Sequence, residues 1–596
     1  MSSTRYIRLA SIAAAAVLAL LPLVLGNFGL GLMNDIGIGA MIALGLVMLT
    51  GVGGVTSFGQ AAFVGIAAYS TAWLTSAHAV SPWLGLAFAL LMTGGAALII
   101  GMLTLRLGNH YLPISTIAWG LSVPLVLSNM DGLGRHTGMG NIKAVELAGV
   151  SLASSGAMYY LIWGALGLVY LFSSNLLQSR QGRAMRSLRG GSSLLASVGA
   201  DSYHLRLKLF VYAALLAGLA GWLYAHNNRF VSPSSFDVRA SIDYLLMGVV
   251  GGLLQLPGAL VGSAIVILMR NTLQDILPHL SSRGAQMEVI VFSLLFLLLL
   301  HRARAGLCGY VLKLAGHYRR ALSPAGLETD ADVRPLERRR QPAAGKTILT
   351  ANQVVKRFGG LVAVNEVGFE IHAGDIVGLI GPNGAGKSTM FNLLTGAARL
   401  TSGSVSFMDR DVTKMSQRDI AQLGMARTFQ HVKLRPQMSL LDNVALGAHG
   451  RTSRGLVAAG LCLDREEERR IFHEARVQLA RVGLAGREHE LAGSLPLGTQ
   501  RMLEIARSLM SDPVMLVLDE PAAGLRHAEK QVLAELLKQL RSDGVTIMIV
   551  EHDMDFVMNL VDRLVVMNFG SKLMEGNPAA VRRDSKVQAA YLGAAA

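Results

Sequence analysis

Cysteine is scarce in this chain, which has only Cys308 and Cys462 among its 596 residues. The two lie far apart and follow no metal-ligand spacing, so the sequence supports neither a disulfide framework nor a zinc site. Charged residues make up 16% of the chain and hydrophobic residues 52%. Because soluble domains carry about 25% charged residues, this composition excludes an entirely soluble protein.

Acidic residues are also few, with 39 Asp and Glu against 54 Lys and Arg, and the net charge is +15. Such a charge is typical of nucleic-acid binding, but here the basic residues cluster beside apolar runs and do not form a face interleaved with aromatic residues. Membrane topology explains them better. We therefore expect no nucleic-acid partner.

A clear signal-peptidase site is missing near the N-terminus. Arg5 and Arg8 precede an apolar stretch over residues 12–25, but no A-x-A pattern follows it. We expect a first membrane helix at this place, with a cleaved signal peptide as the alternative.

Long apolar runs dominate the chain before residue 301. We predict spans near residues 9–26, 36–51, 58–77, 83–105, 111–129, 157–176, 207–227 and 287–301, with residues 242–269 between the last two. Gly251, Gly252 and Pro257 interrupt that stretch, which is either two short spans or a re-entrant hairpin. Counting it as two spans gives about ten in all. The Arg-rich stretch from Arg180 to Arg189 is then a cytoplasmic loop by the positive-inside rule.

Two stretches of this half differ from simple lipid-facing helices. Residues 50–63 are rich in small residues, which allow either close helix packing or an unwound backbone near a transport path. Residues 182–200 form a basic amphipathic segment. It is either a helix that faces phospholipid or one that docks on an ATPase.

The composition divides the chain into three parts. We predict a polytopic α-helical membrane domain over residues 1–301, a basic cytoplasmic linker over 302–346, and an α/β P-loop nucleotide-binding domain over 347–596. The linker is rich in Arg and contains Pro. A flexible tether is the favoured interpretation, and binding of its basic residues to anionic membrane lipid is the alternative.

A phosphate-binding loop lies between an apolar run at residues 376–380 and a helix-like run at 390–394. It fits the pattern G-x-x-x-x-G-K-[ST], in which backbone N–H groups surround phosphate oxygens at a helix N-terminus. We expect Lys387 to reach the β- and γ-phosphates of ATP and Ser388 to bind Mg²⁺. The loop consists of Gly381, Pro382, Asn383, Gly384, Ala385, Gly386, Lys387, Ser388 and Thr389.

Two later apolar runs end in residues suited to phosphoryl transfer. Residues 514–518 precede Asp519 and Glu520, where Asp519 would hold Mg²⁺ and Glu520 would polarise the attacking water. His552 follows the apolar run 546–550, a position from which it can contact the γ-phosphate. Phe358 precedes the loop, where its ring can stack on adenine.

Together these motifs resemble the nucleotide-binding domain of ATP-binding cassette (ABC) transporters over residues 347–596. The resemblance implies that Gln430 senses Mg²⁺ and the attacking water, and that the segment around Gly498 completes the ATP site of an opposing subunit. That segment departs from the family signature L-S-G-G-Q, because Pro496 stands where the serine is expected. Either backbone contacts suffice there, or the site that this segment completes is weakened.

Both halves are most similar to the importers of the branched-chain amino acid family. In the membrane half the resemblance rests on residues 57–63, 182–186 and 230–236, and in the soluble half on residues 503–507, 519–525 and 590–593. The stretch Gly190, Gly191, Ser192, Ser193 replaces residues that are usually charged in that family, which bears on how the loop docks.

The resemblance implies a fused permease and ATPase that imports branched-chain or related hydrophobic amino acids, amides or urea by alternating access across a bacterial inner membrane. Its ATPase domain would be cytoplasmic. Its partners would be a second permease and ATPase, from a paralogue or another copy, and a periplasmic substrate-binding protein. Two alternatives are a homodimeric exporter, against which the number of short spans argues, and a nucleotide-gated membrane receptor that binds ATP without turnover.

Overall fold

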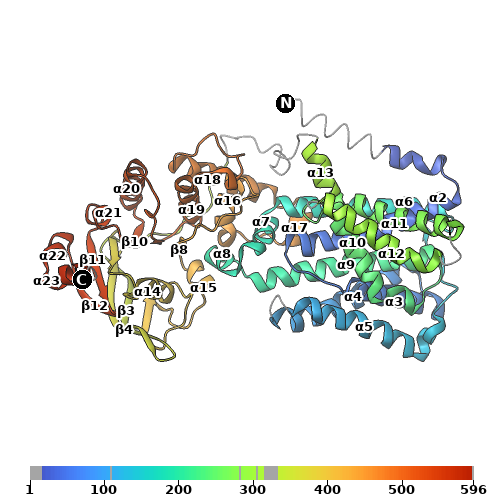
Figure 1. Ribbon diagram of the computed structural model, residues 1–596, viewed down its shortest axis with the longest axis horizontal. Coiled ribbons are helices and arrows are strands. Elements are labelled where there is room, and N and C mark those ends of the chain that lie inside the picture. The colour runs from blue at the N-terminus through green and yellow to red at the C-terminus, as the bar shows by residue number, and fades with distance from the viewer. Residues whose placement is uncertain (1–15, 108–110, 281–283, 304–305, 315–332, 593–596) are drawn as a thin grey trace. The chain divides into compact units, whose positions relative to one another are not determined.

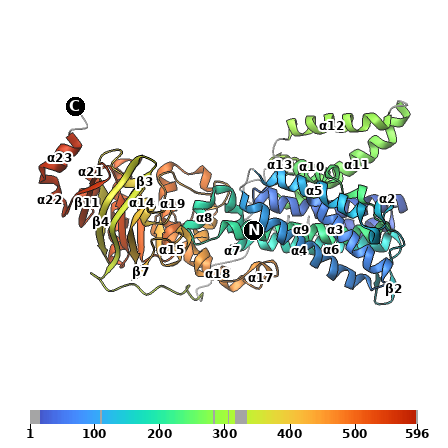
Figure 2. The same ribbon diagram turned by 90° about the horizontal axis from the view of Figure 1, so that it is seen from below.

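A computed structural model describes residues 16–107, 111–280, 284–303, 306–314 and 333–592 (Figures 1 and 2). Arg5, Arg8, most of the first predicted span, much of the linker and Gly593 lie outside the described residues. The chain divides into two compact units, each described by itself. The helical unit contains residues 1–178 and 203–325, and the α/β unit contains residues 179–202 and 326–596. Residues 179–202, which we call the inserted segment, thus belong with the α/β unit. The domain boundaries predicted from the sequence stay predictions.

The helical unit is built of long apolar helices. These are α2 (Asn27–Leu46), α3 (Gln60–Ala72), α4 (Pro82–Thr104), α5 (Leu112–Asn129), α6 (Ser155–Gln178), α9 (Ser202–Asn228), α10 (Val238–Gly251), α11 (Leu256–Leu280), α12 (Gly284–Arg302) and α13 (Leu307–Leu314). Among the described residues, 7 helices are long and apolar enough to cross a membrane. The shorter α3 and α10 lie outside that number, and the total of about ten spans stays a prediction. Helix α2 is buried from Ile36 to its end and packs against α6, α10 and α11.

The small-residue stretch after α2 is both closely packed and partly unwound. The helix passes into a π-helical turn, Val47–Val52, and the next helix begins only at Gln60. A Cβ atom on Gly51 would lie 1.6 Å from the carbonyl oxygen of Leu253, so only glycine fits. Side-chain hydroxyls satisfy part of the freed backbone: the Ala61 N–H donates to Ser241 Oγ at 3.0 Å. Close packing and an unwound backbone are therefore both present in residues 50–63, while a transport path beside them stays a prediction.

The predicted break within residues 242–269 is confirmed. Helix α10 ends at Gly251, and Gly252 follows with a φ of 113°, a backbone conformation that favours glycine. Helix α11 then begins at Leu256, with Pro257 in its first turn. Helices α11 and α12 pack against each other (Figure 2).

The α/β unit contains two sheets. A six-stranded sheet has the order β12-β11-β5-β10-β9-β8, in which only β12 is antiparallel to its neighbour. A four-stranded antiparallel sheet has the order β4-β3-β6-β7. The strands are β3 (Thr347–Phe358), β4 (Leu361–His372), β5 (Ile376–Ile380), β6 (Ser402–Phe407), β7 (Arg410–Asp411), β8 (Met425–Arg427), β9 (Met515–Asp519), β10 (Thr546–Val550), β11 (Arg563–Asn568) and β12 (Ser571–Gly576).

Helices cover these sheets and form a lobe of their own. They are α14 (Lys387–Leu394), α15 (Gln417–Gln422), α16 (Leu440–Ala445), α17 (Leu456–Gly460), α18 (Arg465–Arg481), α19 (Leu497–Leu509), α20 (His527–Ser542), α21 (Met554–Met558), α22 (Pro578–Arg583) and α23 (Ser585–Leu592). Helices α16, α18 and α19 pack together, on a side of the unit away from β3 and β4 (Figure 1). The inserted segment adds α7 (Arg180–Ser187) and α8 (Ser192–Ser197).

The sheet order explains where a functional site forms. Strands β5, β9 and β10 are apolar and fully buried, as parallel strands covered on both faces must be. Strand β10 lies between the other two, and all three run in the same direction. The residues that follow them therefore meet at one edge of the sheet.

Candidate active site

The phosphate-binding loop follows β5 and leads into α14, the predicted strand, loop and helix. Its glycines are needed because the backbone approaches its neighbours closely. Gly386 has a φ of 96°, and a Cβ atom there would lie 2.4 Å from the carbonyl oxygen of Ala363. Asn383, Gly384 and Ser388 are exposed, so the rim of the loop is open to a ligand. The loop can thus present its N–H groups to phosphate oxygens.

Lys387 begins α14 and turns its side chain back over the loop. Its Nζ donates to the carbonyl oxygens of Gly381 at 2.8 Å and Pro382 at 2.9 Å. Burial lowers the pKa of Lys387, and the carboxylates of Glu520 and Asp519 oppose that shift. An ammonium group so placed stands at the anion-binding face of the loop.

Asp519 ends β9 and has the chemistry of a divalent-cation ligand. Its Oδ1 is buried without a hydrogen-bond partner, and the residue is only 6% exposed. Burial raises the pKa of Asp519 to about 6, with Glu520 and Glu551 adding to the rise and Arg427 opposing it. A buried, unsatisfied carboxylate oxygen is costly unless a cation or donor meets it. This orphaned oxygen fits Mg²⁺, which prefers carboxylate oxygen.

The three catalytic residues predicted from the sequence lie together, with Gln430 and His552 beside the carboxylate of Glu520. Gln430 donates from Nε2 to Glu520 Oε2 at 3.2 Å, and His552 Nδ1 lies 4.0 Å from the same oxygen. Glu520 has a positive φ of 47°, and its N–H donates to Val550 O at 2.8 Å. A strained backbone at a functional carboxylate is a recurrent feature of active sites. The arrangement holds a carboxylate, an amide and an imidazole within reach of one water molecule.

Glu551 is a site residue that the sequence analysis missed. It is fully buried and accepts backbone N–H groups from Ala522 at 2.7 Å and His552 at 3.1 Å. It therefore joins the segment after Glu520 to the segment that carries His552. Its position directly before His552, at the end of an apolar strand, was the signal available in the sequence.

Helix α19 is tied to the segment that carries Gln430. Arg501 donates from Nη2 to Gln430 O at 3.3 Å and from Nε to Ala523 O at 3.1 Å. Farther along the helix, Glu504 and Arg507 form a fully buried ion pair at 2.9 Å. Glu504 also accepts the Lys433 N–H at 3.2 Å. Sequence reasoning found none of these contacts, because each joins residues whose pairing depends on the fold.

Gly498 lies in the first turn of α19, and its predicted role at the ATP site of an opposing subunit stays a prediction. A Cβ atom there would lie 2.6 Å from Glu529 Oε1, so a larger residue would displace this carboxylate of α20. Pro496 is the N-cap residue, and no side chain caps the helix. Phe358, at the end of β3, is 53% exposed, with Lys356 Nζ 4.8 Å from its ring centre. An exposed aromatic face is available for stacking.

The inserted segment docks on the α/β unit through buried charges. Arg183 is fully buried, donates to Glu468 Oε2 at 2.7 Å and lies over the ring of Phe472. The Arg180 N–H donates to Glu468 Oε1 at 2.5 Å. Ser193 lies in the uncharged stretch 190–193, and its Oγ accepts a hydrogen bond from Lys433 Nζ at 2.7 Å. Of the two predicted alternatives, docking on this unit is the one that the contacts support.

The helical unit brings together three charged residues that the sequence analysis did not single out. Arg270 of α11 donates to both carboxylate oxygens of Asp243 on α10, at 2.7 and 3.0 Å. Its Nε lies 3.6 Å from Glu288 Oε1 on α12. Charges within apolar helices are costly unless they pair in this way. Their presence in otherwise apolar spans was the sequence signal.

The fold and this site define an ABC-type ATPase joined to a helical membrane protein. Residues 29–300 match a family described as a branched-chain amino acid transport system permease component. Residues 364–523 match the ABC transporter family, and residues 571–596 match the branched-chain amino acid ATP-binding cassette transporter family. The chain belongs to the branched-chain amino acid transport family of ABC transporters, with permease and ATPase on one polypeptide. It is a membrane protein with a peripheral ATPase that binds ATP and couples its hydrolysis to transport.

Three proteins similar to this chain correspond to its ATPase part. The chain is 41% identical over 251 residues to the high-affinity branched-chain amino acid transport ATP-binding protein LivG of Escherichia coli K12, covering 42% of this chain and 98% of LivG. It is 40% identical over 254 residues to BraF of Pseudomonas aeruginosa, covering 42% of this chain and 99% of BraF. A solved nucleotide-free ATP-binding cassette from an ABC transporter is 31% identical, with a TM-score of 0.37, covering 41% of this chain and 98% of that one.

Proposed function

We propose that this chain is the permease and ATPase of an importer that moves a branched-chain amino acid, such as leucine, inward across a bacterial inner membrane. The observation that carries the proposal is the agreement between the two halves. The permease match and the ATPase relatives name the same class of substrate on one polypeptide. Leucine is therefore the first probe to use, and related hydrophobic amino acids, amides and urea are the next.

The geometry of the site supports ATP hydrolysis by activated water. Lys387 would exchange the loop carbonyls for the β- and γ-phosphates, which are stronger acceptors. Glu520 would orient and polarise the attacking water, and Gln430, which already contacts it, would share that water. His552, which lies near the same carboxylate, would contact the γ-phosphate.

The residues that would hold Mg²⁺ are Ser388, Asp519 and Gln430. When bound, this ion neutralises charge on the phosphate oxygens during transfer. Asp519 supplies the fixed carboxylate, because its Oδ1 has no other partner. Ser388 supplies an exposed hydroxyl at the N-terminus of α14.

An opposing ATPase would complete the site. In the proposed assembly, the segment around Gly498 closes on the partner's ATP, and the equivalent segment of the partner closes on the loop of this chain. The second permease and ATPase are a paralogue or another copy, and an external binding protein delivers the substrate. Closure and reopening of the ATPase pair would act on the permease through the inserted segment, which gives alternating access.

A deletion strain that carries plasmid copies of the gene tests this function. Cells with the natural chain should take up radiolabelled leucine. Uptake by cells with Glu520→Gln should be at least about 100-fold slower, because a general base accelerates a reaction by about this factor. Glu535→Gln is the matched control, because Glu535 is exposed on α20. Equal uptake with and without the natural chain would refute the importer, and equal ATP hydrolysis by the natural chain and Glu520→Gln would refute the role of Glu520.

A further inference from the structure

The end of the linker is fastened to the α/β unit and is not a free tether there. Leu336 is 8% exposed and packs in the hydrophobic core of this unit. Arg451 donates from Nη2 to Glu337 O at 2.8 Å, and Gln341 donates from Nε2 to Pro513 O at 3.3 Å. We call residues 336–341 the brace.

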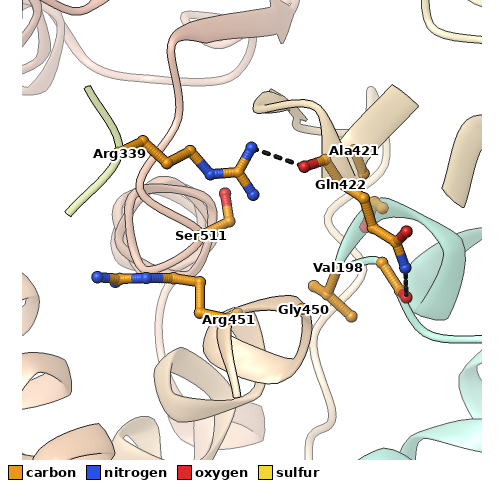
Figure 3. A pocket seen from close by; sticks show the side chains of 10 residues that line it. Val198, Arg339, Ala421, Gln422, Gly450, Arg451 and Ser511 are labelled. Atoms are coloured by element: carbon orange, nitrogen blue, oxygen red, sulfur yellow. Dashed lines mark hydrogen bonds between the residues drawn. The ribbon is translucent and has the colours of Figure 1, made fainter. Parts of the chain in front are cut away.

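Arg339 is the residue of the brace that reaches toward the inserted segment. Its backbone N–H donates to the carboxylate of Asp512, which fixes where its side chain starts. Its Nη1 donates to Gln422 O at 2.8 Å, and the side chain of Gln422 donates to Gly199 O at 3.2 Å (Figure 3). Gln422 thus contacts the brace through its backbone and the inserted segment through its side chain.

The position of Arg339 suits a lasting contact. Helix α15 ends at Gln422, and carbonyl groups at a helix C-terminus attract cations. Burial lowers the pKa of Arg339, the nearby charge of Arg451 lowers it further, and Asp512 opposes the shift. A partly desolvated guanidinium gains more from a carbonyl acceptor than one in bulk water does.

Helix α15 contacts the second half of the inserted segment through several side chains. Gln417 donates from Nε2 to Ser193 O at 3.4 Å, and Arg418 pairs with Asp201 at 2.6 Å. With Gln422, these contacts span residues 193–201 of the segment. Arg339 therefore holds one end of the helix whose side chains hold the segment.

The brace lies outside both large family matches. The permease match ends at residue 300 and the ABC transporter match begins at residue 364. Residues 336–341 are thus a feature of the junction between the two halves in this chain.

We propose that the brace is a coupling element and that Arg339 is a positioning residue that fixes α15 against the inserted segment. ATP hydrolysis does not require this contact, because Arg339 is no part of the active site. Transmission of the ATPase movement to the permease does require it. The part of this inference that concerns transport rests on the proposed function, and the part that concerns the position of α15 does not.

The test compares Arg339→Ala with Arg338→Ala, since Arg338 is the exposed arginine next to it. The full transporter is purified by a tag on this chain and reconstituted in liposomes. We expect Arg339→Ala to hydrolyse ATP within about twofold of the natural rate, while leucine moved per ATP falls about threefold or more. Arg338→Ala should change neither quantity.

Equal coupling in Arg339→Ala and Arg338→Ala would overturn the proposal, as would a fall of hydrolysis and uptake in the same proportion. Hydrogen exchange of the nucleotide-free protein gives an arm that is independent of transport. Amides of residues 193–201 should exchange about threefold faster or more in Arg339→Ala than in Arg338→Ala. Unchanged exchange would refute the brace even if leucine is not the substrate. If Arg339→Ala does not fold, Arg339→Lys and Gln422→Ala replace it. Arg339→Lys should keep the coupling of transport to hydrolysis, and Gln422→Ala should lose it. Loss of coupling in Arg339→Lys with normal coupling in Gln422→Ala would refute the proposal.

Discussion

At the scale of single residues, the active site gathers three carboxylates, of which those of Asp519 and Glu551 are buried. Asp519 has an unsatisfied oxygen and a raised pKa, and Glu520 has a strained backbone. Glu551 is fully buried, and its carboxylate oxygens accept hydrogen bonds from backbone N–H groups. The structure thus places negative charge where a divalent cation would offset it.

This makes stability depend on pH through Asp519. Its pKa rises from the usual 3.8 to about 6 on folding, so the folded protein resists ionisation of this group. Relative to Asp519→Asn, the natural chain should lose stability as the pH rises from about 4 through 6. The loss should reach about 3 kcal/mol at neutral pH, from two pKa units at 1.36 kcal/mol each. Calorimetric unfolding of both proteins in EDTA, from pH 4 to 8, measures the difference. A constant difference across this range would contradict the raised pKa.

At the scale of elements, the inserted segment is held by buried charges of α7 together with buried apolar residues of α8. Glu468 of α18 accepts donors on both oxygens, from the Arg180 N–H and from the Arg183 guanidinium. Breaking a buried pair of this kind leaves one charge without compensation, which costs about 3–5 kcal/mol. Loss of this carboxylate should therefore weaken the docking contact.

Glu468→Gln should loosen this docking while leaving the ATP site intact. The amide NH₂ group would face a donor in either orientation, so one hydrogen bond becomes a repulsion. We expect protease cleavage within residues 179–202 to become at least about tenfold faster, with ATP affinity unchanged. Glu466→Gln is the control, because Glu466 lies on the same helix and is 78% exposed. Equal cleavage in the two variants would contradict the account.

The same elements show what the sequence could predict. The phosphate loop, Asp519, Glu520 and His552 follow buried strands, and sheet topology alone brings such strand ends together. The break at Gly252 was predictable because glycine and proline interrupt an apolar run. The pair Arg183 and Glu468 was not, since 285 residues separate its members and no local pattern specifies the match. Leu336 and Arg339 were read as part of a tether for the same reason: an extended segment without periodicity has no sequence signal of burial.

At the scale of the whole molecule, fusion changes how the parts are joined. The α/β unit takes in residues from two places in the chain, the inserted segment and the end of the linker. Both contact α15, through Gly199 and Arg339. In the fused chain, the end of the linker thus adds a second contact to α15, the helix that binds the inserted segment. Relatives that consist of the ATPase part alone would lack this contact.

The central claim, that ATP hydrolysis at this site drives leucine inward, is tested most directly in proteoliposomes with the ATPase facing outward. In this orientation import corresponds to movement from the lumen to the medium, when binding protein and radiolabelled leucine are sealed inside. Adding Mg²⁺ and ATP to the medium should release leucine from liposomes that contain the natural chain. Liposomes that contain Glu520→Gln should release none. Accumulation of leucine from the medium into the lumen would contradict the account, because it would make the protein an exporter.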